Sequence, residues 1–388
     1  MSEPRRLRLG VIGLGRAFML MLPGLRAHPG YVLAGAADPN PEARAKFSAE
    51  FGARAYETDE ALCRDGGIDA VYVATPHQFH AANARVAAAH GKPVLVEKPM
   101  ALTLEECRAM VDACRAAGVA LVVGHSHSFD APIAATRRLI AGGTLGAVRM
   151  LNALNYTDFL YRPRRPEELD FDSGGAVFNQ GPHQVDVARL LCGGKAASVR
   201  AMTGAWDGTR PIEAAYSALV TFENGAAATL TYNGFGHYDS DVLMDWVGES
   251  GNVKDPARYG EARRALAGRD ETSLRRARGY GVADAAPAPP HHPHFGFLVV
   301  SCDRADLRPT ADSVWVYGDS ERRQEKIAPP VSPRREVLDA FLAAATGGPE
   351  PVQTGDWGLA TMEVCIAIRR SAREGREIAL AHQIAVPA

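Results

Sequence analysis

Alternating strands and helices fill the first 126 residues of the chain, and this feature constrains the fold more than any other. Short runs of valine, leucine, alanine and glycine alternate with segments of about ten to fifteen residues that have helical composition. The expected strands are 8–13, 31–37, 70–74, 93–96 and 119–123, and the expected helices are 16–27, 41–51, 78–90 and 104–117. Because the strands alternate with helices, the pattern predicts an α/β domain with a doubly wound parallel sheet.

Beyond a helix expected at 132–141, strand-like segments replace this alternation. The expected strands are 148–154, 198–205, 214–222, 226–232, 242–248, 297–301 and 313–317, and the expected helices are 181–191, 333–345 and 355–373. Residues 255–295 are rich in arginine, alanine and proline, and we expect an excursion of helix and loop there. The pattern predicts an antiparallel or mixed sheet with few helices.

The length of 388 residues suits two domains of ordinary size. We place them at 1–126 and 127–388, and the helix at 355–373 is a candidate to pack back on the first domain. The net charge of −2 gives no basic field that would attract nucleic acid or an anionic membrane. No apolar run approaches the roughly 20 residues of a membrane span, and the N-terminal segment reads as a first strand rather than a signal peptide. We therefore expect a cytoplasmic protein.

The segment VIGLGRAF lies between an expected strand and an expected helix, and it contains Gly13 and Gly15. In a dinucleotide-binding turn, the first glycine allows the tight turn and the second lets the backbone approach the pyrophosphate. The third glycine would fall at Phe18, so a structural glycine-rich turn is the alternative. Asp38 ends the second strand, where a carboxylate accepts hydrogen bonds from ribose hydroxyls and repels a 2′-phosphate. The order of these features predicts NAD in preference to NADP, with Arg16 among the cofactor-binding residues.

Polar or helix-breaking residues also end the next expected strand, in the segment ATPHQFH. Thr75 and Pro76 follow directly after that strand, and His80 comes shortly afterwards. Ligands of open α/β sheets bind beyond the carboxyl ends of the strands. Thr75 and Pro76 are therefore candidate cofactor-binding residues, whereas His80 suits a cofactor contact and a structural role equally well.

The stretch PVLVEKPMALT ends a strand in Glu97, Lys98 and Pro99. Proline has no N–H for the strand ladder and disfavours helix in the residue before it, so the strand stops and presents Lys98 at its carboxyl end. A surface salt pair is the alternative interpretation. Because several strands end at this edge in unusual residues, Glu97 and Lys98 are candidate residues of the cofactor site.

A second candidate group lies in SGGAVFNQGPHQVDVARLL, which begins with a turn expected at 173–175. The expected helix that follows places His183 and Asp186 one turn apart near its start, and Asn179 precedes His183 by four residues. Without a second reactive group nearby, this pattern is also typical of a capped helix with a surface histidine.

With these motifs in place, the chain resembles the Gfo/Idh/MocA family of nicotinamide-dependent oxidoreductases from Leu9 to its end. The resemblance implies a Rossmann domain followed by an α+β domain whose large open, mostly antiparallel sheet mediates homo-oligomerisation. It implies that Lys98 is the catalytic lysine, which stabilises a developing alkoxide, and that His183 is the catalytic histidine, which takes the proton. Many members have aspartate where this chain has Asn179, so Asn179 is expected to orient a substrate hydroxyl instead.

The segment YTDFLYRPRRPEEL begins at Tyr156 and carries Arg162, Arg164 and Arg165, whose forked guanidinium groups suit carboxylates. The alternative is a solvated basic loop. Together with residues 294–319, it is similar to the branch of the family that oxidises phthalate cis-dihydrodiols. That similarity implies a 4,5-dihydro-4,5-dihydroxyphthalate substrate in aromatic catabolism, a catechol product, and substrate binding by Tyr156, Asn179 and the three arginines.

Two other functions are compatible with the sequence. The first is a sugar or cyclitol dehydrogenase, which would need no carboxylate on its substrate. The second is an NAD-binding sensor without catalytic activity, because Asn179 and Phe18 depart from the usual patterns. The cluster HHPH at 291–294 lacks the spacing of a metal site, so we expect no metal, and six scattered cysteines without a Cys-x-x-Cys pair indicate neither a zinc site nor a disulfide framework.

Overall fold

The computed structural model describes residues 6–124, 126–170, 174–280, 282 and 288–387. Contacts within the chain divide it into two units that are discontinuous in sequence. The first unit contains Met1–His125, Ser273–Ala288 and Val331–Leu359, and the second contains Ser126–Thr272, Pro289–Pro330 and Ala360–Ala388. The sequence pattern predicts one boundary at residue 126, and that boundary puts Ser273–Ala288 and Val331–Leu359 in the second domain. Contacts within the folded chain group both segments with the first unit instead.

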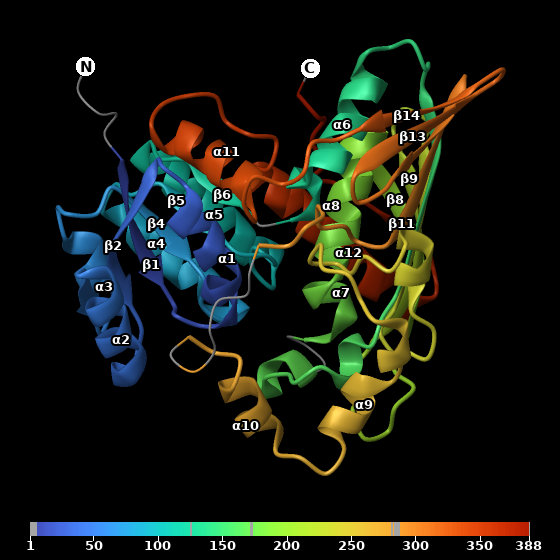
Figure 1. Ribbon diagram of the computed structural model, residues 1–388. Coiled ribbons are helices and arrows are strands. Elements are labelled where there is room, and N and C mark those ends of the chain that lie inside the picture. Colours follow the sequence, from blue (N-terminus) through green and yellow to red (C-terminus); the bar gives the residue numbers. More distant parts are fainter. Residues whose placement is uncertain (1–5, 125, 171–173, 281, 283–287, 388) are drawn as a thin grey trace. The chain divides into compact units, whose positions relative to one another are not determined.

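The first unit is built on a six-stranded sheet in which every neighbouring pair is parallel (Figure 1). The strand order is β3-β2-β1-β4-β5-β6, the order of a doubly wound dinucleotide-binding sheet. The strands are β1 Leu7–Ile12, β2 Tyr31–Ala37, β3 Arg54–Tyr56, β4 Ala70–Val73, β5 Val94–Val96 and β6 Leu121–Val123. The helices are α1 Arg16–Ala27, α2 Pro41–Phe51, α3 Asp59–Arg64, α4 His80–Ala89, α5 Leu104–Ala117 and α11 Arg335–Ala345, with the short 3₁₀ turn η1 His77–Phe79.

Local capping residues explain where these helices begin and end. The side chain of Thr103 accepts a hydrogen bond from the backbone of Glu106, whose carboxylate in turn accepts one from the backbone of Thr103, and this capping box starts α5. Gly118 ends α5 in the left-handed region at φ 65°. Because such signals are local, these boundaries follow from the sequence alone.

The second unit is built on a nine-stranded, mostly antiparallel sheet, in which only β7 and β10 pair in parallel (Figure 1). The strand order is β14-β13-β12-β11-β7-β10-β9-β8-β15. The strands are β7 Val148–Tyr156, β8 Ala196–Gly204, β9 Ala215–Phe222, β10 Ala227–Asn233, β11 Phe297–Cys302, β12 Ala305–Pro309, β13 Ser313–Gly318, β14 Arg322–Lys326 and β15 Ile378–Ala379. The predicted fold class, a parallel Rossmann sheet followed by a mostly antiparallel sheet, is therefore confirmed.

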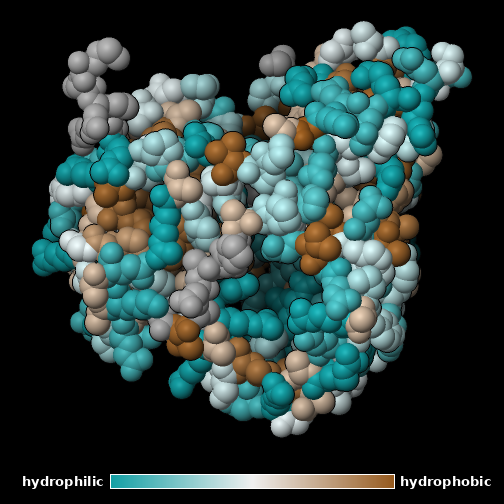
Figure 2. All heavy atoms as spheres, in the orientation of Figure 1, coloured by the Kyte–Doolittle hydropathy of each residue, from teal (hydrophilic) through white to brown (hydrophobic). Residues whose placement is uncertain are grey.

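Helices lie on one face of the nine-stranded sheet, where α8 packs on β7 and β10, and α6 packs on β12 and β13 (Figure 1). The α-helices of this unit are α6 Ala131–Ala141, α7 Gly175–Asn179, α8 Gly181–Cys192 and α9 Glu261–Leu266. Its 3₁₀ turns are η2 His127–Phe129, η3 Phe159–Tyr161, η4 Pro166–Leu169, η5 Ser240–Met244 and η6 Pro256–Arg258, whereas α10 Glu271–Arg276 and α12 Gly355–Glu374 cross from one unit to the other. On the other face of the sheet, Met150, Met202 and Leu219 are exposed at positions that alternate with buried residues. Most of the surface seen in Figure 2 is hydrophilic.

The strand expected at 242–248 is wrong, because η5 and a turn occupy these residues. The side chain of Asp239 caps η5 by accepting a hydrogen bond from the backbone of Asp241, and Asp245 and Trp246 both have positive φ. The buried hydroxyl of Ser240 accepts a hydrogen bond from the backbone of Tyr156. These polar contacts outweigh the apolar pattern that suggested a strand.

Some elements carried no clear strand signal in the sequence. β12, β14 and β15 were not expected, and β14 consists of charged and polar residues because it lies at the edge of the sheet. The turn expected at 173–175 begins outside the described residues, and Gly175 is the first residue of α7.

Candidate active site

The glycine turn after β1 lies against the end of β4. Gly13 has a φ of 95°, and a Cβ atom there would lie 2.9 Å from the carbonyl group of Ala74 and the nitrogen of Thr75. Only glycine tolerates both the backbone conformation and this close approach. Gly15 is the N-cap residue of α1, so the free N–H groups of the first turn are available to a phosphate group.

Asp38 is tied to the same turn. Its Oδ2 atom accepts a hydrogen bond of 2.7 Å from the backbone N–H of Leu14, and its Oδ1 atom accepts one of 2.8 Å from Asn40. A carboxylate has about four acceptor sites, so Asp38 can also accept hydrogen bonds from two ribose hydroxyls. The glycine turn and this acid therefore fit NAD, and Arg16 is the exposed first residue of the helix that follows the turn.

Phe18 occupies the position of the missing third glycine, and its side chain is fully buried. Its ring centroid lies 5.2 Å from that of Tyr280 and 6.2 Å from that of Phe47 on α2. The side chain thus fills the core of the first unit, and the departure from the glycine pattern has a packing reason.

His80 joins the ends of two strands in the first unit. One ring nitrogen lies 2.9 Å from the carbonyl oxygen of Thr75 and the other lies 2.9 Å from that of Pro99, and burial lowers the pKa of His80. The Thr75 hydroxyl donates to Asn83. Both ring nitrogens of His80 face backbone groups, so this histidine positions the segment that begins at Thr75 and Pro76.

Glu97 and Lys98 follow directly after β5, and their environments differ. The buried carboxylate of Glu97 accepts a hydrogen bond of 2.6 Å from the Tyr72 hydroxyl and one of 3.2 Å from Arg334. Lys98 is half-buried at the carboxyl end of the strand, and its peptide bond to Pro99 is cis. Glu97 therefore fixes the end of the strand that carries Lys98.

His183 lies buried in the first turn of α8, in the second unit. Its ring centroid is 4.7 Å from that of His127, in a T-shaped arrangement, and 4.9 Å from that of Phe295. Behind Phe295, the rings of Tyr232 and Tyr216 continue a nearly parallel stack, with centroids 6.0 and 5.8 Å apart in successive pairs. His183 thus lies at one end of an aromatic cluster.

The segment around η2 makes two buried hydrogen bonds, one within the segment and one to α8. Nδ1 of His127 lies 2.6 Å from a carboxylate oxygen of Asp130, and the hydroxyl of Ser128 donates a hydrogen bond of 2.6 Å to Asp186 on α8. Asp186 was expected near His183 on the helix, and the structure gives it this anchoring contact. His127 and Asp130 were not anticipated, although the histidine-rich run HSHSFD after β6 was a signal that could have identified them.

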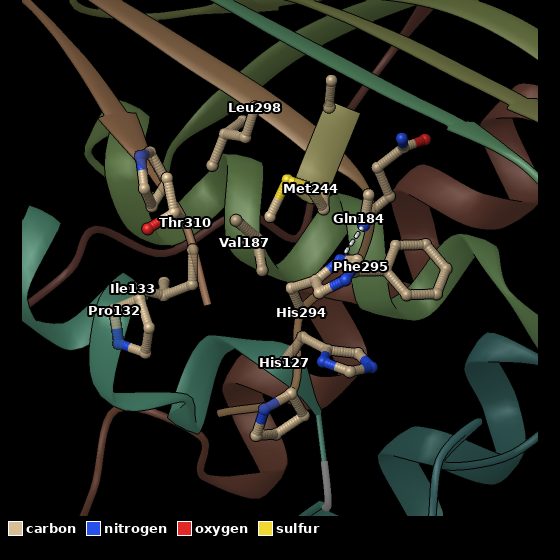
Figure 3. Close-up of a pocket in the computed structure, with 14 residues that line it drawn as sticks. His127, Pro132, Ile133, Gln184, Val187, Met244, His294, Phe295, Leu298 and Thr310 are labelled. Carbon is tan, nitrogen blue, oxygen red and sulfur yellow. Dashed lines mark hydrogen bonds between the residues drawn. The ribbon is translucent and has the colours of Figure 1, made fainter. Parts of the chain in front are cut away.

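A small cavity of about 30 Å³ adjoins this cluster in the second unit (Figure 3). Its lining is mostly apolar and includes Ile133, Val187, Met244 and Leu298. His127 and Phe295, which both contact the ring of His183, also line the cavity. The side of His127 that faces the cavity is therefore not held by close packing.

Two other predicted substrate-binding residues lie in the same unit. The amide nitrogen of Asn179 donates a hydrogen bond of 2.8 Å to the carbonyl oxygen of Gly175, and Asn179 is buried. Tyr156 is half-buried at the end of β7, with its ring 5.9 Å from that of Tyr238.

Two of the three arginines in the basic loop are paired with acids of the chain. Arg162 bonds Asp158 at 2.7 Å and Glu249 at 3.1 Å. Although burial acts in the opposite direction, Arg162 lowers the pKa of Glu249 to about 2. Arg164 stacks on the ring of Phe159 and lies 3.5 Å from Glu168.

Arg165, the third arginine of the loop, is half-buried, and its backbone N–H donates to Glu168. Within the described ranges, its guanidinium group is not paired with a carboxylate. Of the three side chains, Arg165 is therefore the one whose charge the described part of the chain leaves available to a ligand.

The histidines of HHPH bond other parts of the chain. His292 and His294 each lie 2.7 Å from a backbone carbonyl oxygen, and His291 lies 2.6 Å from Asp312. Among the residues that the structure describes, no group of three or more histidine, cysteine or acidic side chains is arranged to hold a metal ion. In the same part of the chain, no helix is long and apolar enough to cross a membrane.

Comparison with known proteins agrees with this geometry. Residues 7–125 match the oxidoreductase family with an NAD-binding Rossmann fold, GFO_IDH_MocA, and residues 133–254 match the GFO/IDH/MocA C-terminal domain. The sequence is 45% identical over 372 residues to 1-carboxy-3-chloro-3,4-dihydroxycyclo hexa-1,5-diene dehydrogenase of Comamonas testosteroni, covering 93% of this chain and 94% of that protein. This chain belongs to the Gfo/Idh/MocA family. The predictions of an oxidoreductase and of NAD as its cofactor are thereby confirmed.

Two further proteins show how widely the relatives of this chain differ. A crystal structure of a dehydrogenase from Bordetella bronchiseptica RB50 is 40% identical and superposes with a TM-score of 0.92, covering 97% of this chain and 100% of that one. The scyllo-inositol 2-dehydrogenase (NAD(+)) of Bacillus subtilis is 28% identical over 257 residues, which cover 64% of this chain and 73% of that protein. The family thus includes enzymes for cyclohexadiene diols and for cyclitols.

Proposed function

We propose that this protein oxidises a carboxylated cyclohexadiene cis-diol, which is the cis-dihydrodiol of an aromatic acid, to a catechol, with NAD as the hydride acceptor. The observation that carries the proposal is the 45% identity, over nearly the whole chain, to a dehydrogenase whose name specifies a ring carboxyl group and two neighbouring hydroxyls. The substrate that we propose is 4,5-dihydro-4,5-dihydroxyphthalate, which places the reaction in aromatic catabolism. The guanidinium group of Arg165, which is not paired with a carboxylate among the described residues, supports the choice of an anionic substrate.

The chemistry assigns one role to each of two side chains. Lys98 hydrogen-bonds the hydroxyl oxygen and stabilises the negative charge that develops on it, and His183 takes the hydroxyl proton. NAD, when bound, accepts the hydride from the carbon that carries this hydroxyl group. The resulting ketone then tautomerises: the neighbouring carbinol carbon loses its proton, the ketone oxygen gains one, and the product is the catechol. Aromatisation makes the overall step favourable. The half-buried position of Lys98 and the buried position of His183 favour these electrostatic roles.

The remaining site residues position the substrate in this proposal. Arg165 pairs with a ring carboxylate in two-point fashion. Arg162 and Arg164, which are already paired, contribute positive charge and hold the loop in place. Tyr156 and Asn179 complete the contacts to the ring and its hydroxyls.

A substrate panel tests the proposal. Purified protein and NAD are incubated with the cis-4,5-dihydrodiol of phthalate, the same diol without carboxyl groups, scyllo-inositol and glucose, and NADH is followed by absorbance. We expect fast turnover of the carboxylated diol and a catechol product by mass spectrometry. A preference for scyllo-inositol or glucose would overturn the proposal and favour the sugar or cyclitol activity seen in other family members.

We also propose a cytoplasmic homo-oligomer that forms through the uncovered sheet face. Met150, Met202 and Leu219 are exposed there, with exposed fractions of 47%, 60% and 44%. Replacing Met202 and Leu219 together by lysine should reduce the mass found by sedimentation, whereas Val253→Lys on an exposed loop should not. An unchanged mass in the double variant would argue against this interface.

A further inference from the structure

The ring of His183 contacts two other rings, and each of these two rings has a further partner of its own. Phe295 stacks on Tyr232 at an interplanar angle of 11°, and His127 is bonded to Asp130. His127 and Phe295 also contact each other, with centroids 5.2 Å apart. The three rings therefore form a triangle in which the orientation of His183 depends on its two neighbours.

The bond between His127 and Asp130 joins two residues of one short segment and does not attach η2 to α8. The hydrogen bond from Ser128 to Asp186 already makes that attachment, and it is buried. Asp130 has an exposed fraction of only 2%, and burial of a carboxylate is costly unless a partner compensates. The His127–Asp130 pair thus calls for a role beyond anchoring the segment.

The cavity beside His127 indicates that role. His127 is one of the residues that line this cavity (Figure 3). The 2.6 Å contact between Nδ1 and the carboxylate of Asp130 helps to hold its ring beside the cavity. That ring and the ring of His183 form a T-shaped contact with an interplanar angle of 64°.

We propose that His127 is a positioning residue for His183, held in place by Asp130 so that its ring fixes the plane of the His183 imidazole. This inference rests on the role of His183 in the proposed function. Proton transfer from a substrate hydroxyl requires a ring nitrogen within hydrogen-bonding reach, so a tilt of the His183 ring would slow the reaction. His127 itself takes no proton from the substrate in this scheme.

Two substitutions separate the ring contact from the bond to Asp130. His127→Asn keeps an amide that can donate to Asp130 but removes the ring that touches His183. His127→Phe keeps the ring but leaves Asp130 without this donor. The matched control is His28→Asn, because His28 is a buried histidine in the first unit that also pairs with an acid, Asp339, at 2.9 Å.

The kcat and KM values for the best alcohol substrate, the kinetic isotope effect at the carbinol carbon, and the Tm are measured for each variant. We expect His127→Asn to lower kcat about 10- to 100-fold while its KM stays within about threefold. We expect His127→Phe to retain more of kcat than His127→Asn despite a lower Tm. His28→Asn should change the Tm but not kcat.

A wild-type kcat in His127→Asn would overturn the inference, because a merely structural role is satisfied by the bond to Asp130. His183→Asn is measured alongside to separate this result from a failure of the proposed function. An unchanged kcat in His183→Asn would refute the role of His183, and this inference with it. A low kcat in His183→Asn combined with a wild-type kcat in His127→Asn would refute the inference alone.

Discussion

The backbone N–H of Leu14, between the two glycines of the β1–α1 turn, donates a hydrogen bond of 2.7 Å to the carboxylate of Asp38 at the end of β2. This bond joins the two strand ends that bind a dinucleotide. Asp38 fixes the turn through this bond, and in the proposed cofactor site it also offers acceptors to the ribose hydroxyls.

Replacing Asp38 by alanine should raise the KM for NAD about 10- to 150-fold and reduce the preference for NAD over NADP. The loss of one charge-assisted hydrogen bond, about 1.5–3 kcal/mol, accounts for the first effect, and removal of the repulsive carboxylate accounts for the second. Steady-state kinetics with both cofactors measure the change. Asp112→Ala, at an exposed position of the first unit, is the control. An unaltered KM for NAD in Asp38→Ala would contradict the assignment.

Replacing Lys98 by methionine should lower kcat/KM about 10²- to 10³-fold and leave NAD binding within about threefold, because the charge acts on the developing alkoxide. Lys92→Met is the matched control. Lys92 lies just before the same strand, and its Nζ atom donates a hydrogen bond of 2.7 Å to the carbonyl oxygen of Ile68. Stopped-flow turnover and NAD titration distinguish the two effects. An equal loss of kcat/KM in Lys98→Met and Lys92→Met would argue against a catalytic role of Lys98.

Replacing Arg165 by methionine should raise the KM for the carboxylated diol about tenfold or more, and it should leave the KM for a neutral diol unchanged. The reason is that a charge-assisted bond to the ring carboxylate is lost. Arg138→Met, at an exposed arginine of the same unit, provides the comparison. The same KM change with both diols would mean that Arg165 does not recognise the carboxylate.

Glu213 provides a test of stability against pH. Burial raises the pKa of Glu213 from 4.5 to about 7, although Arg369 lies 3.5 Å away and acts in the opposite direction. The folded state therefore binds more protons than the unfolded state between these pH values, so the free energy of unfolding falls as pH rises through this window.

Glu213→Gln should accordingly be more stable than the wild type at pH 8, by up to about 3 kcal/mol, and nearly equal to it at pH 4. Thermal unfolding of both proteins at the two pH values measures the difference. Glu223→Gln, at an exposed site, should show no such dependence. A Glu213→Gln variant that is less stable than the wild type at pH 8 would show that ionised Glu213 stabilises the fold.

Sequence predicted the parts of the fold and site that depend on local signals. Strand, glycine turn, helix and acid follow one another within about thirty residues, so a cofactor site at Gly13 and Asp38 could be proposed before folding was considered. Capped helices such as α5 were likewise placed with the correct ends.

Contacts between residues that are distant in sequence could not be predicted from local signals. Arg162 is bonded to Glu249, 87 residues further along the chain, so its pairing emerges only from the fold. The contacts of His183 with His127 and Phe295 likewise depend on η2 and on the segment before β11, both of which are distant from α8 in sequence. The prediction of a strand at 242–248 was wrong for a related reason, because a buried polar contact to β7 favours a different backbone conformation there.

The most direct test of the proposed reaction follows the hydride itself. The protein is given NAD and the cis-4,5-dihydrodiol of phthalate with deuterium on both carbinol carbons, and the products are analysed by NMR and mass spectrometry. The account predicts one deuterium in NADH for each catechol formed and release of the other to solvent. NADH without deuterium, or catechol formed without NADH, would contradict the account.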